Sequence, residues 1–190
     1  LIERAGGEVR LGCAAASIAL EGRRAIGVET NQQFVRGRFV LATLPWERLD
    51  AIVTDAQRDL DGRLRGLPGL GHSPIRGVHL MFDRGVMSEP HLVLPGRGVH
   101  WIFNKGVAED GSQHLHAVIS AADAWMDLKE PEIRRRVMHD VCAAYPAASE
   151  AQVLQCRPVK ERTATFRATP EAESLRPRAA PSPIGPHGGD

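Results

Sequence analysis

The chain has 190 residues, of which 43% are apolar and 25% are charged, a composition that allows a substantial core and excludes a fibrous or wholly disordered protein. Its 24 basic and 23 acidic side chains leave a net charge of +1, which gives no electrostatic basis for a nucleic-acid partner. No apolar run approaches the roughly 20 residues that a membrane-spanning helix needs, so we expect one globular domain or parts of two.

The first part of the chain predicts a β-meander that is followed by a buried strand. Strand-like segments separated by turn residues cover residues 8–11, 14–20, 25–30 and 34–43. Residues 39–44 are apolar except for Thr43, which is typical of a strand covered on both faces. Pro45 ends this strand, and the pattern then predicts a short helix over residues 46–53 and an exposed helix over residues 55–64.

The second part predicts an antiparallel sheet with one long helix. Four strand-like segments joined by short loops cover residues 75–82, 91–94, 99–103 and 114–120. Residues 128–145 carry an apolar stripe at helical spacing, and residues 153–159 and 163–166 predict a further strand. From Thr169 onward, five prolines and the absence of apolar periodicity predict an irregular tail. The fold class is therefore α/β, in the α+β sense.

Three cysteines, an odd number at spacings that match no Cys-x-x-Cys pattern, favour a reducing cytoplasm. The chain begins at Leu1 in the middle of a helix-like phrase, so we expect it to be an internal part of a longer protein. It contains no Gly-x-Gly-x-x-Gly turn for a dinucleotide, no phosphate loop and no nucleophile elbow. The pairs Gly69-Leu70-Gly71 and Gly96-Arg97-Gly98 lack a third glycine, and we interpret both as turns.

Histidines are the first candidates for a chemical site. His114 and His116 lie two residues apart on a predicted strand and therefore face the same side, as two metal ligands would. The spacing reveals no third ligand, and His72, His79 and His100 would converge only through a fold that the sequence does not define. We therefore predict ordinary half-buried strand positions and no metal.

Carboxylates and aromatic residues give further candidates. Asp83 and Asp123 each follow a strand, where Asp commonly accepts backbone hydrogen bonds, and a general acid is the alternative. Trp101 and Phe103 share one strand face and could line a hydrophobic substrate tunnel, although we favour core packing for them. We assign no catalytic residue.

The order of several phrases resembles the FAD-dependent amine oxidases and phytoene-type desaturases. These phrases are Gly7-Glu8-Val9-Arg10-Leu11-Gly12, Gly27-Val28-Glu29-Thr30 and Phe39-Val40-Leu41-Ala42-Thr43-Leu44-Pro45-Trp46. Residues 73–84, 118–123 and 160–166 are similar to the hopanoid-associated subgroup, the hydroxysqualene dehydroxylases once named squalene-associated desaturases. The resemblance covers about residues 1–178.

The resemblance implies part of a two-domain FAD/NAD(P)-binding flavoprotein. Residues 1–46 would be a partial FAD-binding domain with its β-meander, and residues 47–160 would be a substrate domain with a mixed sheet and helices. Residues 161–178 would return to the FAD domain, and residues 179–190 would form an irregular tail. Because the two main FAD-binding phrases of the family are absent from this sequence, we expect that the chain alone does not hold FAD.

The resemblance also implies main-chain contacts with the cofactor. Ala15 would lie on the strand whose backbone meets the adenine ring, and Ala42, Thr43, Leu44 and Pro45 would run close to the adenosine end of FAD. Small side chains suit such contacts, and tight strand packing explains the alanines equally well.

For the parent protein, the resemblance implies reduction of hydroxysqualene to squalene in hopanoid or carotenoid synthesis. A reduced flavin would donate the hydride. The alternatives are a carotenoid-type desaturase, an amine oxidase, and a non-catalytic fragment that does not bind FAD. The expected partner is a hydrophobic isoprenoid, and the expected location is the cytoplasm with peripheral contact with the inner membrane.

Overall fold

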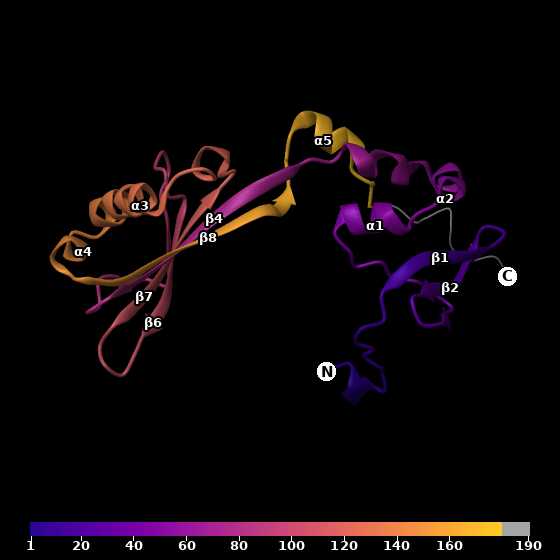
Figure 1. Cartoon of the computed structure of the whole chain (residues 1–190), viewed down its shortest axis with the longest axis horizontal. Helices are drawn as coiled ribbons and strands as arrows, with labels where there is room; N and C mark the ends of the chain where they lie inside the picture. Colours follow the sequence, from indigo (N-terminus) through magenta and orange to yellow (C-terminus); the bar gives the residue numbers. More distant parts are fainter. Residues whose placement is uncertain (180–190) are drawn as a thin grey trace. The chain divides into compact units, whose positions relative to one another are not determined.

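The computed structural model describes residues 1–179 and divides the chain into two compact units (Figure 1). Unit 1 comprises residues 1–70 together with the segment from residue 169 onward, and unit 2 comprises residues 71–168. None of the helices in the described part of the chain is both long and apolar enough to cross a membrane.

Unit 1 begins with a short 3₁₀ helix, η1 (Glu3–Ala5), and then forms the predicted antiparallel meander. Its strands β1 (Ala15–Glu21), β2 (Arg24–Thr30) and β3 (Phe34–Arg36) lie in the order β1-β2-β3. Gly22 adopts a positive φ of 59° in the tight β1–β2 turn, a conformation that favours glycine. Residues 8–11, predicted as a strand, are irregular.

Of the strand predicted over residues 34–43, only β3 (Phe34–Arg36) forms, and residues 37–44 are irregular. Phe39 is 68% exposed and Leu41 is 87% exposed, so the expectation of a strand covered on both faces is wrong for the described chain. Such a strand needs hydrogen-bonded neighbours at its edges and packed layers on its two faces. Among the described residues, only the Gly37 N–H of this segment donates to another strand, to the Ile26 carbonyl, and most apolar side chains of residues 37–44 therefore remain at the surface.

The helices of unit 1 are α1 (Trp46–Ile52), α2 (Asp55–Leu60), the 3₁₀ helix η2 (Gly62–Gly69) and α5 (Pro170–Leu175). The predicted helix over 55–64 is thus an α-helix followed by a 3₁₀ segment. α5 corrects the expected irregular tail: Thr169 caps its first turn, and Pro170 stands where a missing N–H costs nothing. α5 packs against η2. Most of the tail predicted over residues 179–190 lies outside the described residues.

Unit 2 is a five-stranded sheet with helices. Its strands are β4 (His72–Phe82), β5 (His91–Val93), β6 (Trp101–Val107), β7 (Gln113–Ser120) and β8 (Val153–Phe166). They lie in the order β5-β6-β7-β4-β8, and every described pairing is antiparallel, so the sheet is not mixed. The helices are η3 (Asp123–Trp125), α3 (Glu130–Ala144) and α4 (Ala147–Glu150). The α+β class is confirmed.

The core of unit 2 lies on one face of this sheet. Alternate β4 residues, Val78, Leu80 and Phe82, are fully buried in a cluster that includes Ile133 and Val137 of α3. The intervening residues point to the other face, which we call the open face. The open face comprises His79 and Met81 of β4, Trp101 and Phe103 of β6, His114 and His116 of β7, and Gln155, Arg157 and Val159 of β8. These side chains are partly or fully exposed, so no described element of unit 2 seals this face.

One charged residue of β4 points toward the core side. Arg76 is only 6% exposed, and its Nε and Nη1 atoms are buried with no hydrogen-bond partner among the described residues. Its cross-strand neighbours are Ile119 and Lys160, and the nearby Arg162 adds a like charge. Burial, followed by this like charge, lowers the pKa of Arg76 from its usual value. A buried guanidinium without a counter-ion destabilises a fold.

We therefore expect Arg76→Met to stabilise the chain. Replacing the guanidinium by an apolar side chain of similar length removes its desolvation cost, and the free energy of unfolding should rise by about 1–3 kcal/mol. Urea denaturation followed by circular dichroism measures this difference. Arg134→Met, at an exposed position of α3, is the control and should change stability by less than about 0.5 kcal/mol. A less stable Arg76→Met variant would contradict this account.

Candidate functional site

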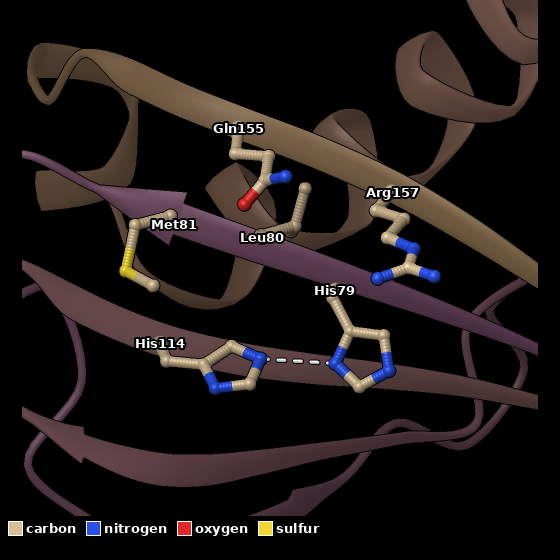
Figure 2. A pocket seen from close by; sticks show the side chains of 6 residues that line it. All are labelled: His79, Leu80, Met81, His114, Gln155 and Arg157. Atoms are coloured by element: carbon tan, nitrogen blue, oxygen red, sulfur yellow. Dashed lines mark hydrogen bonds between the residues drawn. The ribbon is translucent and has the colours of Figure 1, made fainter.

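The open face of unit 2 contains a polar pocket of about 290 Å³ (Figure 2). Residues from three neighbouring strands, β4, β7 and β8, line it: His79, Leu80, Met81, His114, Gln155 and Arg157. Figure 2 shows the His79 and His114 rings pointing toward one another across the β4–β7 pair, with Arg157 beside His79. The pocket therefore collects side chains that are far apart in the sequence.

Strand register explains this convergence. His79 lies directly opposite His116 on β7 and Arg157 on β8, and His114 is two residues from His116 on the same face. The Nδ1 atom of His79 is 2.9 Å from Nε2 of His114, a hydrogen-bond distance. The His79 ring also stacks on His116, with centroids 4.2 Å apart and planes 1° from parallel.

A glycine of β4 makes room for one of these rings. A Cβ atom on Gly77 would come within 2.6 Å of Nε2 of His116. The absence of a side chain at residue 77 therefore lets the His116 imidazole lie close to the β4 backbone. This close approach holds His116 against His79.

Burial and like charges favour the neutral forms of His79 and His116. Burial lowers the pKa of His116 to about 4, helped by the nearby His79, Lys105 and His114. Burial also lowers the pKa of His79, and His114 and Arg157 add to that effect. When neither ring of the His79–His114 pair carries an extra proton, one ring donates and the other accepts, so the two outer nitrogens are one donor and one acceptor in either tautomer. That combination matches a hydroxyl group, which also donates and accepts.

An aromatic strip lies beside the polar pocket on the open face. The Trp101 and Phe103 rings stack with centroids 5.7 Å apart, and the Phe103 ring centroid is 6.5 Å from that of His116. The ring centroid of His91, on β5, lies 6.0 Å from that of Trp101. Trp101 is 36% exposed, so the interpretation of this residue as core packing is wrong. The strip provides an apolar surface next to hydrogen-bonding groups.

The other histidines do not join this cluster. His100 accepts a hydrogen bond from the Ser120 backbone through Nδ1, and neither His100 nor His72 lines the pocket. Within residues 1–179, no group of three or more His, Cys, Asp or Glu side chains has the arrangement of a metal site. His79 is the pocket member that spacing alone missed, because only the β4–β7 register brings it to His114 and His116.

The two aspartates at strand ends have structural partners. Asp83 accepts a hydrogen bond from the Gln152 backbone and pairs with Arg84, and both contacts lower the pKa of its carboxyl. Asp123 pairs with Arg167 at 2.7 Å, which lowers its pKa as well. Both carboxyls are therefore ionised at neutral pH, which favours their structural interpretation over a general acid.

The predicted cofactor residues lie in unit 1 but not in one pocket. Ala15, at the start of β1, lines an open groove of about 380 Å³ together with Val28, Thr30 and Val35. Ala42 lines a different, mostly apolar groove of about 210 Å³, and Thr43, Leu44 and Pro45 are exposed and line neither. The small Ala15 side chain beside an open groove fits a planar base. The described residues offer no glycine-rich turn for a pyrophosphate, so only an adenosine-end contact fits them.

The depressed histidine pKa values predict acid-sensitive stability. Because the pKa of His116 is about 4 in the folded chain and about 6.5 when unfolded, protonation favours the unfolded state. The stabilisation is complete above about pH 6.5 and is lost as the pH falls toward 4. In the His116→Phe variant, the free energy of unfolding should depend less steeply on pH between about pH 4 and 6.5, by up to about 1.4 kcal/mol per pH unit. Urea denaturation at several pH values measures this slope.

Arg134→Met, at an exposed position of α3, offers a control that leaves every histidine in place, and it should retain the wild-type pH dependence. Identical curves for wild type and His116→Phe would contradict the burial of a neutral His116.

Comparisons with known proteins find one curated relative and several solved structures that are similar to this chain. The chain is 36% identical over 115 residues to a hydroxysqualene dehydroxylase from Sinorhizobium fredii, covering 58% of this chain and 26% of that protein. An oxidoreductase from Methanosarcina mazei matches with a TM-score of 0.64 and 16% identity, over 85% of this chain and 40% of that one. Putrescine oxidase bound to putrescine matches with a TM-score of 0.62 and 18% identity, over 82% of this chain and 36% of that one.

The two structural matches show the fold alone. The chain spans about a quarter of the length of the curated relative and 40% or less of these solved structures. The sequence model of one family, the flavin containing amine oxidoreductases, matches residues 1–189. The chain therefore belongs to the flavin containing amine oxidoreductase family.

Proposed function

We propose that the whole protein is a flavin-dependent oxidoreductase that reduces hydroxysqualene to squalene. The observation that carries the proposal is the 36% identity to hydroxysqualene dehydroxylase over 115 residues, within a chain that belongs to a flavoenzyme family. The specific substrate follows from that relative, and the chemistry of the open face supports it.

The open face offers the two kinds of surface that such a substrate requires. Hydroxysqualene is a long hydrocarbon with one hydroxyl group. The Trp101–Phe103 strip would contact part of the hydrocarbon, and the His79–His114 pair would hydrogen-bond the hydroxyl. The pocket volume of about 290 Å³ accommodates the polar end of the molecule and not its whole length.

The reaction replaces a C–O bond by a C–H bond. One hydride and one proton are consumed, and the hydroxyl leaves as water, so the substrate gains two electrons. When bound, a reduced FAD supplies the hydride. The role that we assign to His79 and His114 is to hold the hydroxyl in one orientation while the aromatic strip fixes the adjacent hydrocarbon.

For the cofactor, we propose that Ala15, Ala42, Thr43, Leu44 and Pro45 contribute main-chain contacts at the adenosine end of FAD in the whole protein. Residues 1–46 would then be part of the FAD-binding domain, residues 47–160 the substrate domain, and residues 161–178 the return segment. We also propose a cytoplasmic protein in peripheral contact with the inner membrane, since a squalene-like substrate dissolves in lipid.

Product analysis tests the proposed reaction. The whole protein that contains this chain, loaded with FAD and reduced anaerobically, should convert hydroxysqualene to squalene, which gas chromatography and mass spectrometry detect. One squalene should form for each reduced flavin. Absence of squalene would contradict the proposal. Desaturation of phytoene or oxidation of an amine by the oxidised enzyme would support one of the alternative functions instead.

Substitution of the histidine pair tests the assigned site. His79→Phe and His114→Phe each remove a hydrogen bond worth about 0.5–1.5 kcal/mol, so KM for hydroxysqualene should rise roughly 2- to 10-fold. Inhibition by squalene, which lacks the hydroxyl, should remain unchanged, and His139→Phe on the exposed side of α3 is the matched control. An equal loss of affinity for both molecules would contradict a hydroxyl-specific role.

A further inference from the structure

Unit 1 contains a groove lined by arginines, to which the proposed function assigns no role. Three arginines, Arg24, Arg36 and Arg38, line an open groove of about 360 Å³ together with Glu21, Ile26 and Gly37. We call it the arginine groove. The β1–β2 turn and the end of β3 form it, and Arg23 in the same turn adds a fourth positive charge. A chain whose net charge is only +1 thus concentrates four arginines on one hairpin and its neighbouring strand.

These arginines lack the carboxylate partners that several other surface arginines have. Arg135 and Arg136 both pair with Glu132. By contrast, over residues 1–179 the side chains of Arg24 and Arg36 form no ion pair or hydrogen bond with another side chain, and the described contact of Arg38 is with the Phe39 ring. All three groove arginines are exposed. Among the described residues that line the groove, Glu21 is the one carboxylate beside these three positive charges.

The groove has the chemistry of a phosphate site. A guanidinium offers a planar fork of donors that binds two phosphate oxygens at once, and it is less strongly hydrated than a lysine ammonium. Antiparallel pairing holds the backbone of Arg36 opposite Gly27, so the cations are displayed on a paired scaffold. A cluster of four arginines is also the size of basic cluster that recognises anionic membrane surfaces.

We propose that the arginine groove binds the phosphates of anionic phospholipid headgroups and so attaches unit 1 to a membrane surface. The choice of lipid over free phosphate rests on the proposed function, because a hydroxysqualene-reducing enzyme draws its substrate from lipid. The groove itself is independent of that function.

The arginine groove is distinct from the predicted adenosine contact. Ala15 pairs with Thr30 at one end of the β1–β2 hairpin, whereas Glu21 pairs with Arg24 at the other end. Six residues of extended strand separate these ends by roughly 20 Å. The groove beside Ala15 and the arginine groove share no lining residue.

Vesicle sedimentation with the purified 190-residue chain tests the proposal. The chain should bind anionic vesicles that contain phosphatidylcholine and about 30% phosphatidylglycerol. It should not bind vesicles of pure phosphatidylcholine, which carry no net charge. Since each arginine near an anionic surface strengthens binding about fivefold, the triple variant Arg24→Gln, Arg36→Gln, Arg38→Gln should bind roughly 100-fold more weakly. Glu21→Gln should bind several-fold more tightly, because it removes the carboxylate of the groove.

The run Arg134, Arg135 and Arg136 of α3 provides a matched control. Its triple glutamine variant loses the same charge and should bind the anionic vesicles like wild type. Equal losses for both triple variants would show non-specific attraction and overturn the proposal, as would wild-type chain that ignores anionic vesicles. Full competition by millimolar inorganic phosphate or by FAD would assign the groove to a soluble phosphate instead. Because this assay needs neither flavin nor turnover, its result is separate from that of the hydroxysqualene assay.

Discussion

The architecture of unit 2 depends on strand β4, whose alternate side chains lie in the core and on the open face. β4 lies between β7 and β8, and its alternate residues Val78, Leu80 and Phe82 enter the core beneath α3. The residues between them, including His79, must then lie on the open face. A register slip of one residue would bury the imidazole and expose the core side chains. The burial of three large apolar groups, each worth about 1.5–3 kcal/mol, therefore also positions the polar pocket.

The open face combines features that a single cluster of polar residues would not provide. Burial and nearby cations, Arg157 and Lys105 among them, lower the pKa values of His79 and His116 and so disfavour their protonated forms. Neutral imidazoles can recognise a hydroxyl without attracting a counter-ion, and the stacked Trp101 and Phe103 rings extend the surface with apolar area. One fold can serve enzymes with many different substrates. The substrate is therefore inferred from the side chains of the open face and not from the fold.

Much of this fold could be predicted from the sequence, because alternation and helical stripes report burial directly. The strands at 75–82 and 114–120 and the helix at 128–145 form nearly as predicted. Residues 37–44 and α5 were predicted wrongly. Residues 37–44 form no strand with any described neighbour, and α5 forms because Thr169 caps its first turn within proline-rich surroundings. Spacing placed His114 beside His116, but His79 and Arg157 join them only through cross-strand register.

The central claim is that the open face of unit 2 binds an isoprenoid alcohol. Nuclear magnetic resonance of the chain during titration with farnesol, a shorter isoprenoid alcohol, tests it most directly. The account predicts chemical-shift changes in the imidazoles of His79 and His114 and in the indole of Trp101, with the buried Trp125 indole unchanged. Shifts confined to Trp125 and α3, or no shifts at all, would contradict the claim.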